Sequence, residues 1–336
     1  MNRSSLRVLL PQPIETEAME LIASAGFEVV LSPDPKPETV FSLMKGIQGI
    51  ILRTGIKMTR ELMSHGNNLR VISRTGAGVD NVDVAAATDL EILVTCVPDA
   101  HTKTVVEHTL ALILALLKQI PFMDREVRQD HFDIRFQNIP RDLNQKILGV
   151  VGFGRIGSEL ARICHHAFEM TILAHDPYLS PAAQAAFQGW VQFYDLESLF
   201  RESDVISLHL PLLPKTQKII SAKEFIWMKP DAFLVNTSRG GVLDEEALVQ
   251  CLKEKRIAGA GLDVFSQEPL EKEHPLKTMD HVILTPHTAA LTKECVLRLA
   301  TEAAKTTVHV LQGKKPDHKM IVNPEVLKKP RWQGLF

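Results

Sequence analysis

The sequence predicts an α/β protein of two domains, each built on a parallel sheet that helices cover on both faces. Short apolar segments alternate with helix-like segments through residues 6–97, and a second alternation runs from residue 146 to about residue 285. Strands that alternate with helices in this way form parallel sheets. The chain has 336 residues, which is enough for two such domains.

Composition narrows the classes of protein to consider. Hydrophobic residues make up 45% of the chain, and the formal net charge is −2 with acids and bases interspersed, so we expect no nucleic-acid partner and no membrane partner. Four scattered cysteines without a C-x-x-C motif are typical of reduced thiols in a cytoplasmic protein. The N-terminal apolar run is too short for a signal peptide, and the longest run, residues 110–117, cannot span a bilayer. We assign no metal site.

The first alternating series, residues 6–97, predicts a complete α/β domain before the second series begins at residue 146. Its expected strands cover residues 7–10, 28–31, 49–52, 69–73 and 92–96. Its expected helices cover residues 15–25, 39–45, 59–64 and 83–88.

The middle of the chain separates the two series. Residues 104–118 are apolar nearly all round, which predicts a buried helix, and Pro98 and Pro121 mark breaks on either side. Residues 124–144 are polar and aromatic without a clear period, and we interpret them as a connecting arm.

The second series predicts the second domain. Its expected strands cover residues 147–151, 170–175, 205–209, 233–237, 259–264 and 282–285. Its expected helices cover residues 155–166, 196–201 and 244–253. A last amphipathic helix is expected at 293–312, followed by an irregular tail that contains three prolines.

A glycine motif, G-x-G-x-x-G, follows the first strand of the second series. Gly152 suits a tight turn, Gly154 lets the backbone approach a pyrophosphate, and Gly157 allows the helix to pack closely on its strand. Phosphates would then lie at the helix N-terminus, where free N–H groups and the helix dipole favour anions. The motif therefore predicts a dinucleotide site.

Asp176 ends the next expected strand, nineteen residues beyond Gly157. A carboxylate at this position can accept hydrogen bonds from both ribose hydroxyls of an adenosine and would repel a 2′-phosphate. We therefore expect NAD rather than NADP as the cofactor. The alternative is that Asp176 begins a turn before Pro177.

Three strands of the second series each precede an ionisable residue: Arg239, Glu268 and His287. In a parallel sheet all three would lie at the edge that carries the glycine loop. An arginine can hold the carboxylate of a 2-oxo acid, a histidine can protonate its carbonyl oxygen, and a glutamate can orient the histidine and favour its charged form. Individually, Arg239 could be a surface residue, Glu268 an N-cap before Pro269, and His287 a core histidine.

Five blocks of sequence resemble the D-2-hydroxyacid dehydrogenases, and the resemblance runs from about residue 6 to 325. The blocks are Ser73-Arg-Thr-Gly-Ala-Gly-Val-Asp-Asn-Val-Asp83, the glycine motif, Asn236-Thr-Ser-Arg-Gly-Gly241, Asp263-Val-Phe-Ser-Gln-Glu-Pro269 and Thr285-Pro-His-Thr288. The resemblance implies a flavodoxin-like substrate domain at 1–102 and 293–336, a Rossmann NAD-binding domain at 103–292, a cleft between them and a homodimer.

The resemblance also implies roles for individual residues. Arg239 would bind substrate, Glu268 would orient, and His287 would act as acid and base. The other residues that it implies to contact NAD are Arg155, Ile156, Asp176, Leu210, Thr237 and Asp263. The backbone of Gly76, Ala77 and Gly78 would contact the substrate carboxylate.

Within the family, the block at 73–83 is most similar to D-3-phosphoglycerate dehydrogenases. Arg53, Arg74 and Arg135 stand where those enzymes have basic residues near the substrate phosphate, although they could instead pair with surface carboxylates. We expect a short form without the C-terminal regulatory domain that many of those enzymes carry. Thr288-Ala-Ala290 replaces a glycine pair found in many members, which affects the local loop and hence substrate fit.

These observations predict an NAD-dependent D-2-hydroxyacid dehydrogenase that transfers hydride between NAD(H) and a small 2-hydroxy or 2-oxo acid. D-3-phosphoglycerate is the leading substrate, and reduction of hydroxypyruvate or glyoxylate is the alternative. A third hypothesis, from a different class, is an NAD-sensing corepressor, because C-terminal-binding proteins keep the same fold and the same three residues.

Overall fold

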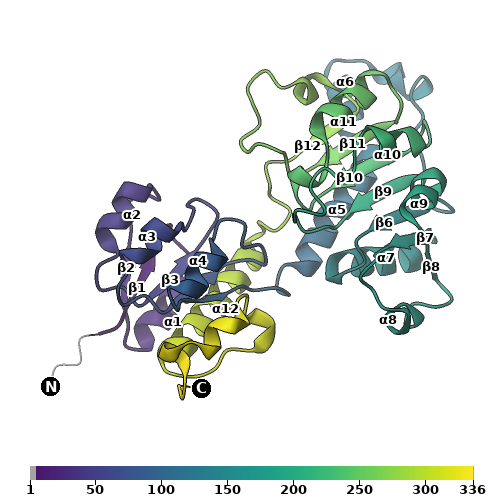
Figure 1. Cartoon of the computed structure of the whole chain (residues 1–336). Coiled ribbons are helices and arrows are strands. Elements are labelled where there is room, and N and C mark those ends of the chain that lie inside the picture. The colour runs from purple at the N-terminus through teal and green to yellow at the C-terminus, as the bar shows by residue number, and fades with distance from the viewer. Residues whose placement is uncertain (1–4, 336) are drawn as a thin grey trace. The chain divides into compact units, whose positions relative to one another are not determined.

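The computed structural model describes residues 5–335, so the outer limits expected at residues 1 and 336 lie outside the described residues. The chain forms two compact units, one from Met1–His101 with Leu291–Phe336 and the other from Thr102–Ala290. Each unit contains one parallel sheet, of five strands in the first and seven in the second (Figure 1). The predicted fold class, two doubly wound parallel sheets, is confirmed.

The sheet of the first unit has the strand order β2-β1-β3-β4-β5, which is the flavodoxin-like order. Its strands are Arg7–Leu10 (β1), Glu28–Leu31 (β2), Gly49–Leu52 (β3), Val71–Arg74 (β4) and Leu93–Thr95 (β5). Strand β4 begins two residues later than expected, because the Leu69 N–H bonds to the Gly66 carbonyl at 2.8 Å in a turn.

Helices cover both faces of this sheet. They are Thr16–Ser24 (α1), Pro37–Leu43 (α2), Arg60–Ser64 (α3), Val84–Asp89 (α4) and Lys293–Leu311 (α12). Helices α2, α3 and α4 enclose one apolar layer, whereas α12 packs on β3, β4 and α1. Within the unit, the Thr307 hydroxyl of α12 donates to the Ser73 hydroxyl of β4 at 2.8 Å, which joins segments far apart in sequence.

The C-terminal tail belongs to the first unit and is more regular than expected. It forms three short 3₁₀ helices, His318–Met320 (η4), Pro324–Lys328 (η5) and Pro330–Trp332 (η6). The buried Asn323 side chain accepts a hydrogen bond from the Val94 N–H at 2.8 Å and donates to the Ile92 carbonyl at 3.0 Å. These bonds attach the tail to the edge of the sheet at β5.

The sheet of the second unit has the order β12-β11-β10-β9-β6-β7-β8, which is a Rossmann order extended by one strand. Its strands are Ile147–Val151 (β6), Thr171–His175 (β7), Val191–Phe193 (β8), Val205–Leu208 (β9), Phe233–Asn236 (β10), Gly259–Leu262 (β11) and Val282–Leu284 (β12). The strand order reverses beside β6, and ligands of such sheets bind outside the carboxyl ends at that point.

Two apolar layers lie on the two faces of this sheet. Helices Thr102–Leu117 (α5) and Arg155–Phe168 (α7) cover one layer, and Leu196–Glu202 (α9), Ala222–Trp227 (α10) and Glu245–Lys253 (α11) cover the other. Helix α5 is buried along most of its length, as expected, but Glu107 and Ala111 are exposed. The sequence analysis missed the short elements β8, α10 and Pro181–Ala185 (α8).

The connecting arm is partly helical, which corrects the expectation of an irregular segment. Helix α6 spans Ile120–Arg128, and a 3₁₀ helix, η1, spans Phe132–Phe136. Arg128 bonds to Asp124 one turn earlier at 2.8 Å, a pairing that supports a helix. None of the residues of α6 is buried.

Across residues 5–335, no single helix has the length and apolar character needed to cross a bilayer. The pair formed by α5 and α6, bent by 56°, meets the requirement of length and composition only when the two helices are taken together.

Candidate active site

The glycine loop after β6 has the geometry that a bound pyrophosphate requires. Gly152 has a φ of +89°, and a Cβ there would lie 2.5 Å from the His209 carbonyl oxygen. A Cβ on Gly157 would lie 2.2 Å from the Gly152 oxygen, so α7 could not pack this closely with a larger residue. A Cβ on Gly154 would meet nothing within 4 Å, and no side chain caps α7. Open backbone at a helix N-terminus therefore fits a dinucleotide phosphate.

Asp176 lies at the end of β7 and is bonded to the glycine loop itself. Its Oδ2 accepts a hydrogen bond from the Phe153 N–H at 2.9 Å, and its Oδ1 accepts one from the Tyr178 N–H at 3.0 Å. Asp176 therefore begins a turn, as the alternative interpretation held, and also places a carboxylate beside the loop. The turn and the bond to the glycine loop are both compatible with a contact between the Asp176 carboxylate and a ribose.

The other residues expected to contact NAD differ in exposure. Arg155 is exposed, whereas Ile156 and Leu210 are half-buried. Thr237 is buried, and its hydroxyl pairs with the Thr109 hydroxyl at 2.8 Å. Their contacts with NAD stay predictions.

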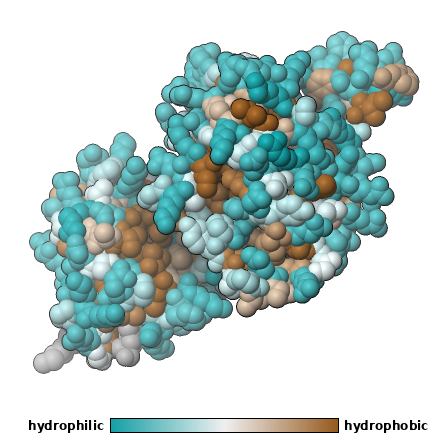
Figure 2. All heavy atoms as spheres, turned by 45° about the vertical axis from the view of Figure 1, so that its right-hand side comes forward, coloured by the Kyte–Doolittle hydropathy of each residue, from teal (hydrophilic) through white to brown (hydrophobic). Residues whose placement is uncertain are grey.

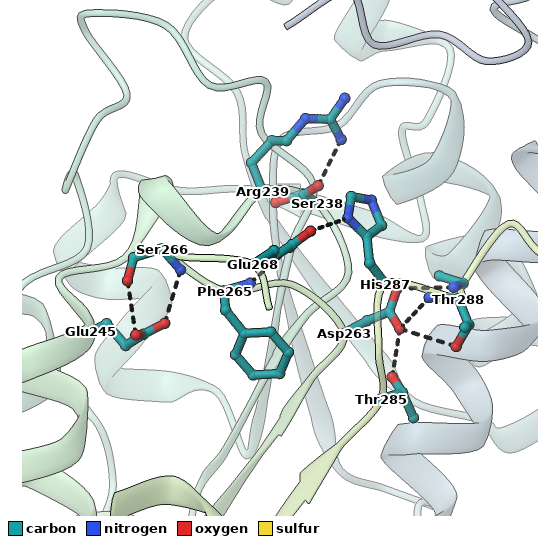
Figure 3. A network of polar contacts seen from close by, with 11 residues as sticks. Ser238, Arg239, Glu245, Asp263, Phe265, Ser266, Glu268, Thr285, His287 and Thr288 are labelled. Carbon is teal, nitrogen blue, oxygen red and sulfur yellow. Dashed lines mark hydrogen bonds and ion pairs between the residues drawn. The ribbon is translucent and has the colours of Figure 1, made fainter. Parts of the chain in front are cut away.

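The structure brings together Arg239, Glu268 and His287 from the loops that follow β10, β11 and β12 (Figure 3). Nδ1 of His287 donates to Oε2 of Glu268 at 2.7 Å. Arg239 lies near both groups, and its Nη1 donates to the Ser238 carbonyl at 2.8 Å. His287 and Glu268 keep 45% and 37% of their side-chain surface exposed, so the pair is open to a ligand.

The hydrogen bond determines the charge of the pair. The bond to Glu268 raises the pKa of His287 above its usual value of 6.5, and it outweighs the opposing effect of burial. Burial acts to raise the pKa of Glu268, but the hydrogen bonds from His287 and the Phe265 N–H outweigh it, so the pKa is lowered. A carboxylate with a stabilised imidazolium can store and deliver one proton.

The loops of Arg239 and Glu268 are in direct backbone contact. A Cβ built on Gly240 would lie 1.9 Å from the carbonyl carbon of Phe265, so a side chain there would separate the two loops. The Phe265 N–H in turn donates to Oε1 of Glu268 at 3.1 Å. Gly240 therefore helps to fix how close Glu268 lies to Arg239.

Asp263 holds the backbone that carries His287, a role that the sequence analysis did not assign. His287 has a φ of +53°, in the left-handed region, and its N–H donates to the Asp263 carbonyl at 2.8 Å. The Asp263 carboxylate has no exposed surface and accepts hydrogen bonds from the Thr285 hydroxyl and from the N–H groups of Thr288 and Ala289, at 2.5, 2.8 and 2.9 Å. The contact of Asp263 with NAD stays a prediction.

Helix α5 reaches the same network through His108. The Nε2 atom of His108 lies 3.0 Å from the Thr285 hydroxyl, which itself donates to Asp263. Thr285 belongs to a block quoted for the family resemblance, but no sequence signal singles out His108 on a mostly buried helix.

The first unit carries the residues expected to contact substrate. Ala77 is exposed and Gly76 and Gly78 are half-buried in the loop after β4. Arg74 is only 7% exposed, and it donates to the carbonyls of Leu52 and Gly78, both at 2.9 Å. Arg74 thus fixes the shape of the loop.

The two remaining arginines of the expected phosphate site have protein partners. Arg53 donates to the Pro13 carbonyl at 3.1 Å and lies 3.5 Å from the Glu15 carboxylate. Arg135, in the second unit, stacks on the rings of Phe132 and Phe136 at 4.6 Å from each centroid. Their binding of a phosphate stays a prediction.

Among residues 5–335, no group of three or more His, Cys, Asp or Glu side chains is placed to hold a metal ion.

Residues 110–289 match the sequence profile of the D-isomer specific 2-hydroxyacid dehydrogenase, NAD binding domain. The chain belongs to the D-isomer specific 2-hydroxyacid dehydrogenase family. The predicted family membership is thereby confirmed, and the matched residues include the glycine loop, Asp176 and the Arg–Glu–His group.

Two relatives of this dehydrogenase family illustrate its range. D-3-phosphoglycerate dehydrogenase of Methanocaldococcus jannaschii is 38% identical over 309 residues, covering 92% of this chain and 58% of that protein. Glyoxylate reductase of Aeropyrum pernix is 38% identical over 330 residues, covering 96% of this chain and 97% of that protein. The chain thus spans somewhat more than half the length of the first relative and nearly all of the second.

Solved structures have the same fold as this chain. The TT0316 protein of Thermus thermophilus has a TM-score of 0.86 at 31% identity, covering 94% of this chain and 100% of that chain. D-lactate dehydrogenase of Aquifex aeolicus, complexed with NAD and lactic acid, has a TM-score of 0.83 at 29% identity, covering 94% and 98%.

The geometry predicts that Glu268→Gln lowers the pKa of His287. The wild-type pair keeps the imidazole protonated to a higher pH than usual; without the carboxylate charge, the proton is lost at a lower pH. NMR titration of histidine ring signals, with His287 assigned by substitution, measures this directly. Glu271→Gln, at an exposed position of the same loop, is the control and should leave the titration unchanged. An unaltered His287 titration in Glu268→Gln contradicts the assignment.

Proposed function

We propose that this protein is an NAD-dependent D-2-hydroxyacid dehydrogenase, an oxidoreductase that interconverts a 2-hydroxy acid and a 2-oxo acid. The observation that carries the proposal is the 2.7 Å hydrogen bond between His287 and Glu268 beside Arg239, at the sheet edge that also holds the glycine loop. The proposal is further supported by the names of the family relatives.

Each residue of this group has one task in the reaction. Arg239 binds the substrate carboxylate, because its guanidinium can donate two parallel hydrogen bonds to two oxygens. His287 gives its Nε2 proton to the carbonyl oxygen during reduction and accepts a proton from the hydroxyl during oxidation. Glu268 bonds to Nδ1 and so leaves Nε2 directed at substrate. NAD(H), when bound at the glycine loop, supplies or accepts the hydride.

We take D-3-phosphoglycerate as the leading substrate. Its support is the sequence block at 73–83 and the 38% identity to a D-3-phosphoglycerate dehydrogenase over 92% of this chain. Under this proposal, Arg53, Arg74 and Arg135 are the candidate phosphate ligands, and Gly76, Ala77 and Gly78 contact the carboxylate.

Reduction of hydroxypyruvate or glyoxylate is the second candidate, and two observations favour it. Arg74 is buried, and its Nε and Nη1 donate to backbone carbonyls of the first unit, so this arginine has a structural role that does not involve a substrate phosphate. The Aeropyrum pernix glyoxylate reductase is also 38% identical to this chain, over 330 residues.

We also propose that two copies of the chain form a homodimer through the arm. Large apolar side chains are exposed along it, and a second copy would cover them. They are Val127 (51% exposed), Phe132 (59%), Phe136 (71%) and Ile139 (75%), and Ile120 (57%) lies just before the arm at the start of α6. Figure 2 shows that the face turned toward the viewer has brown apolar patches among teal hydrophilic side chains.

Turnover with different 2-oxo acids distinguishes the two candidate substrates from each other and the enzyme from a corepressor. We expect NADH oxidation with 3-phosphohydroxypyruvate to be faster, in kcat/KM, than with hydroxypyruvate or glyoxylate, and His287→Ala to lower kcat by roughly 10²–10⁴ while NADH affinity is retained. Higher kcat/KM with glyoxylate or hydroxypyruvate favours the second candidate. If no 2-oxo acid in a broad panel is reduced, the enzymatic proposal fails and an NAD-sensing corepressor takes its place.

Asp176 should determine cofactor choice. Asp176→Asn keeps an acceptor for the Phe153 N–H but removes the charge that repels a 2′-phosphate, so we expect the NADH-to-NADPH ratio of kcat/KM to fall. Steady-state kinetics with both cofactors measures the ratio. Equal use of NADPH by the wild type would refute the assignment.

Phe136→Ser combined with Ile139→Ser should dissociate the proposed dimer, because both changes remove exposed apolar area from the arm. Sedimentation should give about twice the chain mass of 37.5 kDa for the wild type and about that mass for the variant. Ile226→Ser, at a 64% exposed position on α10, is the control and should remain dimeric. A monomeric wild type rules the dimer out.

A further inference from the structure

We propose that Glu245 is a positioning residue that fixes the loop carrying Glu268 against His287. The inference rests on the proposed function for the roles of Glu268 and His287. It adds a residue that lies outside the Arg–Glu–His group and acts through it.

Glu245, the first residue of α11, directs its carboxylate at the loop rather than at its own helix. Oε1 accepts a hydrogen bond from the Ser266 hydroxyl at 2.8 Å, and Oε2 accepts one from the Ser266 N–H at 3.0 Å (Figure 3). Nε2 of His274, further along the same loop, lies 3.4 Å from Oε1. The Glu245 and His274 side chains are only 13% and 16% exposed, so the carboxylate reaches the exposed Ser266 from a mostly buried position.

Ser266, the residue bonded to Glu245, lies next in sequence to the contacts that hold Glu268 in position. Phe265, the neighbour of Ser266, packs its backbone on Gly240 and donates its N–H to Glu268. Ser266 lies two residues before Glu268, so a shift of Ser266 moves both partners of that bond. Because a carboxylate that accepts two hydrogen bonds from one residue fixes its orientation as well as its position, Glu245 restrains the loop in both respects.

The start of α11 does not need Glu245 for its own stability. The Asp244 side chain accepts from the Ala247 N–H as N-cap, and Glu246 adds an exposed negative charge in the first turn. Both groups complement the helix dipole. Glu246 therefore offers a matched control, with the same charge in the same turn.

Glu245→Gln tests the proposal, since glutamine keeps the size of the side chain but can accept only one of the two Ser266 bonds. With Glu268 less well held, we expect the His287 titration to move to lower pH by roughly half a unit or more, and kcat for reduction to fall roughly three- to thirtyfold with KM little changed. Glu246→Gln should leave both measurements at wild-type values.

A double variant separates positioning from general destabilisation. If Glu245 acts through Glu268, Glu245→Gln should add little to the pKa shift and the loss of kcat already caused by Glu268→Gln. Additive losses, or a wild-type His287 titration in a folded Glu245→Gln protein, overturn the proposal. If Glu245→Gln does not fold, Ser266→Ala provides the test. It removes the hydroxyl bond to Glu245 and should shift the His287 titration in the same direction by a smaller amount.

The NMR titration needs no substrate. If the wild type reduces none of the acids tested but Glu245→Gln shifts the His287 titration, the link between Glu245 and His287 stands although the proposed function fails. If instead the wild type reduces a 2-oxo acid and Glu245→Gln leaves the His287 titration unchanged, the proposed function stands and the role of Glu245 is wrong.

Discussion

All seven strands of the second sheet run parallel, and the rest of the site depends on this constraint. Parallel strands end at one edge, so loops separated by more than a hundred residues in sequence open at the same place. The glycine loop follows β6, and Arg239, Glu268 and His287 follow three successive strands. An antiparallel strand among β10, β11 and β12 would send one of these loops to the opposite edge.

Proximity alone does not give the Glu268–His287 bond its geometry. The left-handed backbone of His287 costs about 1–3 kcal/mol in a residue other than glycine. Asp263 offsets this cost, because its buried carboxylate and its carbonyl accept hydrogen bonds from His287 and from the residues around it. Buried groups beneath the loop thus hold an exposed side chain in one orientation.

Much of the site could be predicted because its signals are local. The glycine spacing is fixed by a turn and a close helix contact, and β-branched runs followed by polar residues identify the strand ends. Other features depend on partners far away in sequence. The burial of Arg74 against Leu52 and Gly78, the bonds of Ser266 to Glu245, and the reach of His108 to Thr285 follow no sequence pattern. Short elements such as β8 and α10 carry too few residues for a period to emerge.

The first unit is interrupted by the second, and this has a consequence for synthesis on the ribosome. Residues 102–290 form a contiguous unit that can fold as soon as it emerges. The first unit must wait for α12, because this helix covers β3 and β4 and its Thr307 bonds to Ser73. The nascent chain therefore carries an incomplete N-terminal core, with apolar strands open to chaperones or to aggregation, until the whole second unit and α12 have been translated.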